Sequence, residues 1–81
     1  MRIEIKLSGE LKRYARAGGG SVIESEQAMT VAEAMARLGV EEAPDELLAI
    51  VNDEVVPPGS RGQRKLEDND RLTLMPQLKG G

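Results

Sequence analysis

Residues 30–40 read TVAEAMARLGV and contain the start, the body and the end of one amphipathic helix. Thr30 and Glu33 form a capping-box pattern, in which each side chain accepts a hydrogen bond from the backbone N–H of the other residue. Four apolar residues recur at helical spacing and form one stripe: Val31, Ala34, Met35 and Leu38. Gly39 stands where a left-handed C-terminal cap belongs. The stretch predicts a helix over residues 31–38 whose stripe belongs to the core.

Two strands are predicted before this helix. Residues 2–8 alternate polar and apolar side chains, which indicates a strand with one buried face. Residues 21–26 contain Val22 and Ile23 and are expected to pair with the first strand as a hairpin. Residues 9–20 between them are expected to place Leu11 and Tyr14 over the end of the core. The three consecutive glycines at 18–20 favour a loop over a phosphate cradle, because no Gly-Lys-Ser/Thr sequence follows.

Three more strands are predicted after the helix. Residues 47–51, LLAIV, form a continuous apolar run, which indicates a strand covered on both faces for part of its length. The Asn-Asp dipeptide at 52–53 predicts a tight turn because both residues tolerate positive φ, and residues 54–56 return as a short strand that ends at a Pro-Pro-Gly sequence. Residues 71–75 alternate again, with Leu72 and Leu74 facing the core, and Pro76 ends the strand because it has no N–H donor.

Two charged segments lie in the connections. Residues 41–46 are acidic but lack the ligand spacing of a calcium loop, which favours a solvated face. Residues 60–65 form a polar loop with three basic residues, which we expect to be solvated, the alternative being a docking site for an acidic partner. Leu66 is expected to anchor this loop, and residues 67–70 to turn into the last strand.

The predicted order is strand, strand, helix, strand, short strand, strand. One helix across one face of a mixed sheet of four to five strands is a two-layer α+β design. We expect one domain over residues 1–76, followed by a flexible tail over residues 77–81. The opposite face of the sheet is expected to be partly exposed, with Met75 and Leu78 near the root of the tail, and to serve as a docking surface.

Composition excludes several classes of site. The 81 residues include no Cys, His, Trp or Phe, and Tyr14 is the only aromatic residue. Without Cys and His, a transition-metal site and a thiol or imidazole catalyst are not expected. The net charge of −3 and the single ring do not fit a nucleic-acid surface. No long apolar run indicates a membrane span and the charged first residues do not resemble a signal peptide, so we expect a cytoplasmic protein.

The last residues, MPQLKGG at 75–81, are the most distinctive chemical feature. Two terminal glycines leave only backbone and a carboxylate beyond Lys79. Such a tail is slender enough to enter a narrow tunnel, and from Gln77 to Gly81 it reaches roughly 17 Å when extended. Chain ends also commonly carry small, frayed residues, so the tail alone leaves open whether it is functional or incidental.

Several segments together resemble the MoaD/ThiS family of ubiquitin-like, β-grasp sulfur carriers. The resemblance covers nearly the whole chain and combines the order of elements with three segments: AIVND at 49–53, LEDNDRL at 66–72 and MPQLKGG at 75–81. The third is the most specific, because a strand, a proline and an apolar residue precede the terminal Gly-Gly. The resemblance implies a β-grasp fold and a carrier protein rather than an enzyme.

The resemblance also implies roles for the tail. A ubiquitin-activating-type enzyme, similar to MoeB or ThiF, would use ATP and magnesium to adenylate Gly81, which is then converted to a thiocarboxylate. Gly80 would provide the slenderness needed to enter both partners. Partner contacts would come from Met75, Pro76, Leu78 and Lys79. The carrier itself would bind neither cofactor nor metal, because its partners supply them.

The sulfur-accepting partner is left open by the sequence. The length and the long first hairpin resemble the molybdopterin branch, in which the partner is a MoaE-like large subunit of molybdopterin synthase and the product a molybdenum or tungsten cofactor. The alternatives are a thiamine carrier that serves thiazole synthase and a ubiquitin-like modifier joined to lysines through Gly81. A plain interaction module with incidental glycines is a further alternative.

Overall fold

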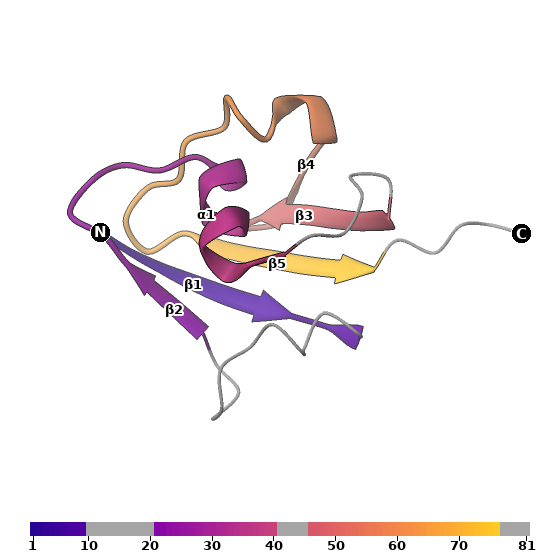
Figure 1. Ribbon diagram of the computed structural model, residues 1–81, viewed down its shortest axis with the longest axis horizontal. Helices are drawn as coiled ribbons and strands as arrows, with labels where there is room; N and C mark the ends of the chain where they lie inside the picture. Colours follow the sequence, from indigo (N-terminus) through magenta and orange to yellow (C-terminus); the bar gives the residue numbers. More distant parts are fainter. Residues whose placement is uncertain (10–20, 41–45, 77–81) are drawn as a thin grey trace, which may run out of the picture.

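The computed structural model describes residues 1–9, 21–40 and 46–76. Its elements are, in order, β1 (Arg2–Leu7), β2 (Ser21–Glu24), α1 (Val31–Leu38), β3 (Leu47–Val51), β4 (Glu54–Val56), the 3-10 turn η3 (Pro58–Ser60) and β5 (Arg71–Pro76). The five strands form one mixed sheet in the spatial order β2-β1-β5-β3-β4. Figure 1 shows α1 lying across this sheet. The α+β, β-grasp architecture predicted from the sequence is therefore confirmed.

β5 is the central strand of the sheet. It pairs with β1 in parallel and with β3 antiparallel, while β2 and β4 are the two edges. A parallel pair needs a long crossover between its strands, and here β2, α1, β3 and β4 all lie between β1 and β5 in the chain. The last strand is consequently paired on both sides as far as Leu74, and on the β3 side as far as Pro76.

The helix begins and ends as its sequence predicts. The Glu33 N–H donates to Thr30 Oγ1 at 3.2 Å, and the Thr30 N–H donates to Glu33 Oε1 at 3.0 Å. Gly39 has a φ of 77°, the left-handed conformation of a C-terminal cap. The next donors of the first turn, on Val31 and Ala32, bond to backbone carbonyls of the loop at residues 61–64. All these N–H groups have partners within the protein, so they are not available to an anion.

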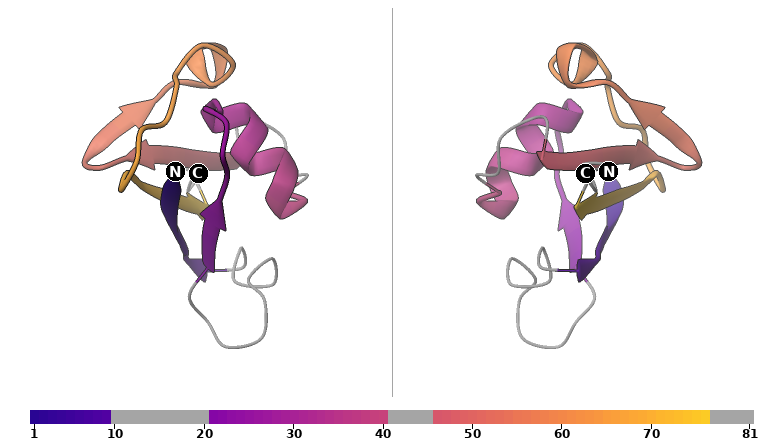
Figure 2. Two further views of the ribbon diagram at one scale, coloured as in Figure 1. Left: turned by 90° about the vertical axis from the view of Figure 1, so that its left-hand side faces the viewer. Right: turned by 90° about the vertical axis from the view of Figure 1, so that its right-hand side faces the viewer.

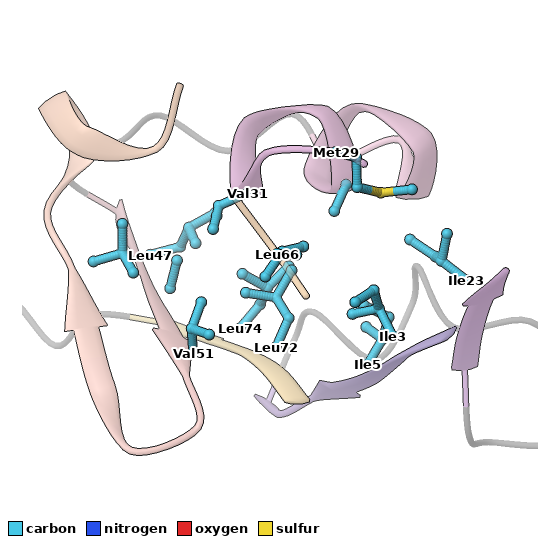
Figure 3. Close-up of a cluster of buried hydrophobic side chains, with 13 residues drawn as sticks. Ile3, Ile5, Ile23, Met29, Val31, Leu47, Val51, Leu66, Leu72 and Leu74 are labelled. Atoms are coloured by element: carbon cyan, nitrogen blue, oxygen red, sulfur yellow. The ribbon is translucent and has the colours of Figure 1, made fainter. Parts of the chain in front are cut away.

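The core fills the layer between α1 and the sheet, as Figure 3 shows. Thirteen buried apolar side chains form it among the described residues: Ile3, Ile5, Ile23, Met29, Val31, Ala34, Leu47, Ala49, Val51, Val56, Leu66, Leu72 and Leu74. Leu72 and Leu74 face the helix as predicted, and Leu66 anchors its loop at 2% exposure. Burial of each large side chain contributes about 1.5–3 kcal/mol, so these residues hold the small domain together.

The face of the sheet opposite α1 is here called the open face. Within the described ranges no helix lies over it, as the two side views in Figure 2 show. Along β3, burial alternates: Leu47, Ala49 and Val51 are fully buried on the helix side, while Leu48 and Ile50 are half-buried on the open face. The predicted strand is confirmed, and its second face is covered only in part.

Three details differ from the sequence expectations. β2 ends at Glu24 rather than at residue 26, because Glu24 already pairs with Arg2, the first residue of β1. At the turn after β3, only Asn52 has positive φ, at 52°; Asp53 does not. Arg61 was expected to be solvated, but it is 6% exposed. The expectations for Leu11, Tyr14, the triple glycine and residues 41–45 lie outside the described residues.

Candidate functional site

The root of the tail lies at the end of β5. Met75 pairs with Leu48 and Pro76 with Leu47, and both tail-root residues are half-buried. Pro76 is the last residue of the strand, as predicted from its missing N–H. The other predicted site residues lie outside the described residues: Leu78, Lys79, Gly80 and Gly81. Of the predicted partner contacts, the structure therefore describes only Met75 and Pro76, whose side chains lie on opposite faces of the strand.

An apolar patch continues from Met75 across the open face. It consists of Met75 on β5, Leu48 and Ile50 on β3, and Val55 on β4. Leu48 lies directly opposite Met75, and Ile50 directly opposite Val55. Since side chains alternate along a strand, all four point away from the helix. Val55 is 53% exposed. The sequence indicated Met75 as a contact, but the other three become neighbours only through the strand register.

The rest of the open face carries mainly charged side chains, together with the exposed Val22 on β2. On the β1 side of β5, Glu4 lies opposite Arg71, with 3.5 Å between Glu4 Oε2 and Arg71 Nε. Arg2 lies opposite Glu24 on the edge strand. Charges of opposite sign that face each other across strands stabilise a sheet modestly. The open face is thus divided into a charged half over β2 and β1 and an apolar half next to the tail root.

Two motifs that support the family resemblance meet in space. Asn52 Nδ2 donates to Asp70 Oδ1 at 3.0 Å, and the Arg71 N–H donates to Asn52 Oδ1 at 3.0 Å. The other oxygen of Asp70 accepts from the Glu67 N–H at 2.8 Å. We call Asn52, Asp70 and their two partners the turn cluster. These motif residues fix the turns at the start of β5, at the end away from the tail, and their role is structural.

Arg61 is a buried residue that sequence reasoning missed. Its guanidinium Nη2 donates to the Leu47 carbonyl at 2.9 Å, and its Nε has no partner within the described ranges. Burial lowers the pKa of Arg61, because the charged form loses hydration. β4 ends at Val56, opposite Ala49, and continues into Pro57 and Pro58, which have no N–H to offer Leu47. The double proline was the available signal that another donor is required there.

Neither a metal-binding cluster nor a membrane-spanning helix is found among the described residues. In this part of the chain, no group of three or more acidic residues is placed to hold a metal ion. Among the same residues, no helix has the length and apolar character needed to cross a membrane. What the arrangement offers is a five-stranded sheet, an apolar patch and a last strand that ends next to the terminal residues in the chain.

Comparison with solved structures agrees with this arrangement. SAMP1 from Haloferax volcanii superposes with a TM-score of 0.72 at 23% identity, with both chains covered completely. ThiS from Geobacter metallireducens gives 0.65 at 18% identity, over 96% of this chain and 99% of that one. A chain of the complex of subunits 1 and 2 of molybdopterin-converting factor from Helicobacter pylori gives 0.64 at 20% identity, with full coverage of both. At these identities the likeness shows the shared fold.

Sequence comparison identifies the family. No curated protein gives a significant match. The model of the ThiS family, in contrast, matches residues 5–81. This range contains all five strands except the first three residues of β1, and it ends at the terminal Gly-Gly. With this match and the β-grasp fold, the chain belongs to the ThiS family of small sulfur-carrier proteins.

Proposed function

We propose that the protein carries sulfur as a thiocarboxylate on Gly81. The observation that carries the proposal is the family match, which extends through Gly80 and Gly81 to the last residue. In the proposed reaction, a carboxylate oxygen of Gly81 bonds to the α-phosphorus of ATP and pyrophosphate leaves. A sulfide-level nucleophile supplied by a partner then attacks the acyl carbon and AMP leaves. Adenylation is needed because a free carboxylate is a poor electrophile.

The composition of the chain supports a proposal in which the partners supply the catalytic groups. The chain has no Cys or His, so base, metal and nucleotide chemistry come from an adenylating enzyme of the ubiquitin-activating type that uses ATP and magnesium. The carrier contributes its tail and a surface that its partners recognise. We propose that this surface is the apolar patch, which includes Met75, and that Pro76, Leu78 and Lys79 extend the contact from the strand end along the tail.

For the acceptor of the sulfur, we favour molybdopterin synthesis. The length of the chain and its long first hairpin support this choice. A chain of the Helicobacter pylori molybdopterin-converting factor complex, which contains two subunits, also shares the fold over its full length. The proposed second partner is a MoaE-like large subunit. The likeness to Geobacter ThiS is equally close, so thiazole synthase is the alternative acceptor that the experiment must include. The proposed location is the cytoplasm.

Intact-protein mass spectrometry tests the carrier function. The full chain is incubated with ATP, magnesium, a sulfur source and candidate activating enzymes from the same cell. We expect a gain of about 16 Da, the difference between oxygen and sulfur, located at Gly81. The matched control is the chain without Gly81, which keeps every described residue and should show no gain. A folded full-length chain that stays unmodified with every activating enzyme would overturn the proposal.

A second step identifies the acceptor. The thiocarboxylated chain is offered separately to the molybdopterin synthase large subunit with its pterin precursor and to thiazole synthase with its substrates. We expect sulfur loss only in the first reaction. Loss only in the second would assign the carrier to thiamine synthesis. If higher-mass conjugates form in cells and vanish when Gly80 and Gly81 are deleted, the protein is instead a modifier of other proteins.

A further inference from the structure

The contact between Gly9 and Pro76 lies where β1 and β5 end side by side. Leu7 pairs with Leu74, and the Ser8 N–H donates to the Leu74 carbonyl at 3.1 Å. Pro76 has no N–H with which to continue this parallel ladder. Gly9 then adopts a φ of +59°, a conformation that glycine enters without strain. The last backbone hydrogen bond of the ladder is thus followed by a packing contact.

This contact leaves no room for a side chain at position 9. A Cβ placed on Gly9 would lie 2.9 Å from Pro76 Cγ and 3.2 Å from Pro76 Cδ. Ordinary contacts between carbon atoms are about 3.5–4.0 Å long. The Pro76 ring is stiff and its φ is fixed near −65°, and on its other side Pro76 pairs with Leu47 of β3. A side chain at position 9 would therefore push the tail root out of its place.

We infer that Gly9 is a positioning residue for the tail: its bare Cα receives the Pro76 ring and fixes the point from which residues 77–81 leave the sheet. The inference rests on the proposed function of the tail. A carrier docked through the apolar patch must deliver Gly81 to a partner's reactive centre, and small misplacements of reacting groups are costly. The contact restricts where the tail starts and so raises its effective concentration at that centre.

The chain offers a matched pair of variants. Gly39 also has positive φ, at +77°, but a Cβ there would meet nothing within 4 Å. Asparagine tolerates this conformation, and Asn52 and Asn69 already adopt it in this chain. Gly9→Asn and Gly39→Asn thus make the same chemical change at similar φ. Only Gly9→Asn brings a Cβ against the tail root.

The first measurement is kcat/KM for thiocarboxylation of the full chain by its activating enzyme. We expect a loss of roughly 3- to 10-fold in kcat/KM for Gly9→Asn, because misplacement of a reacting group slows its reaction. Gly39→Asn should leave kcat/KM unchanged. In a Pro76→Ala background, which lacks the ring, Gly9→Asn should have no further effect. Equal kcat/KM for the two variants, or the same loss with and without the ring, would overturn the inference.

A second measurement does not depend on the enzyme. Amide resonances of Gln77 and Leu78 in NMR spectra should move in Gly9→Asn and stay in place in Gly39→Asn. Unmoved resonances would overturn the inference even if Gly9→Asn were less stable. If no form of the chain is ever thiocarboxylated, the proposed function fails. The NMR comparison would still show whether a side chain at position 9 displaces the tail root. Should Gly9→Asn not fold, the smaller Gly9→Ala is compared with Gly39→Ala in the same way.

Discussion

Arg61 provides the Leu47 carbonyl with a hydrogen-bond donor, because Pro57 and Pro58 have no backbone N–H to offer. We expect Arg61→Met, which keeps an unbranched stem, to lower the free energy of unfolding by about 1–2 kcal/mol because the buried Leu47 carbonyl loses its donor. The melting temperature should then fall by roughly 4–16 °C. Arg64 on the same loop, paired with Glu54 near the surface, is the control; Arg64→Met should cost under about 1 kcal/mol. Equal losses for the two would contradict this role of Arg61.

The pH dependence of that loss follows from the direction of the pKa shift. Burial lowers the pKa of Arg61, so the charged form is less favoured in the folded state than in the unfolded state. That cost is present in full at every pH below the folded pKa, declines as the pH rises from the folded to the unfolded pKa, and is absent above the unfolded pKa. Arginine stays protonated near neutrality. Chemical denaturation should therefore show the same difference in the free energy of unfolding between Arg61→Met and the parent from about pH 5 to 9.

Asn52 stabilises the turn after β3 through its side-chain hydrogen bonds as well as through its positive φ. Asn52→Gly preserves the positive φ but removes the hydrogen bonds to Asp70 and to the Arg71 N–H. We expect a loss of about 1–2 kcal/mol in the free energy of unfolding. Asn69 also has positive φ, at 69°, and its side chain makes no hydrogen bond in the described part of the chain. Asn69→Gly should stay within about 0.5 kcal/mol of the parent, and a loss as large as that of Asn52→Gly would argue against the turn cluster.

The two edge strands allow a test of the docking surface at the scale of elements. Val55 on β4 and Val22 on β2 both lie on the open face, 53% and 44% exposed. Val55 belongs to the apolar patch, whereas Val22 lies opposite Glu4 in the charged half. We expect Val55→Glu to raise the KM for the activating enzyme about 10-fold or more, because a carboxylate is buried at the interface. Val22→Glu should leave KM unchanged. An equal rise in KM for Val22→Glu would show that the activating enzyme does not dock specifically on the apolar half of the open face.

At this scale the sequence predicted most of the fold. Local signals, such as the capping box at Thr30 and the alternation of residues 71–75, place α1 and β5 within a residue. Register is not local: that Met75 lies opposite Leu48, and Asn52 next to Asp70, follows from pairing between strands far apart in the chain. Arg61 shows the same limit. Its burial depends on the Leu47 carbonyl fourteen residues earlier, which no window around residues 60–65 contains.

For the molecule as a whole, stability and chemistry should reside in separate segments. A domain of this size is stable by about 4–12 kcal/mol, and all thirteen buried apolar side chains among the described residues precede residue 76. We expect deletion of residues 77–81 to change the free energy of unfolding by less than about 0.5 kcal/mol while abolishing thiocarboxylation. A loss above about 1 kcal/mol would show that the tail is part of the folded domain and would refute the predicted boundary at residue 76.

The prolines after β4 have a consequence for crowded solutions. An exposed strand edge is a template on which another copy of a protein can add its own strand. Here β4 is three residues long and runs directly into Pro57 and Pro58, so the hydrogen-bonding edge stops almost where it starts. A small protein with an exposed apolar patch beside a strand edge is at risk of self-aggregation. At the β4 edge, the two residues without N–H groups limit the strand pairing that another copy could make.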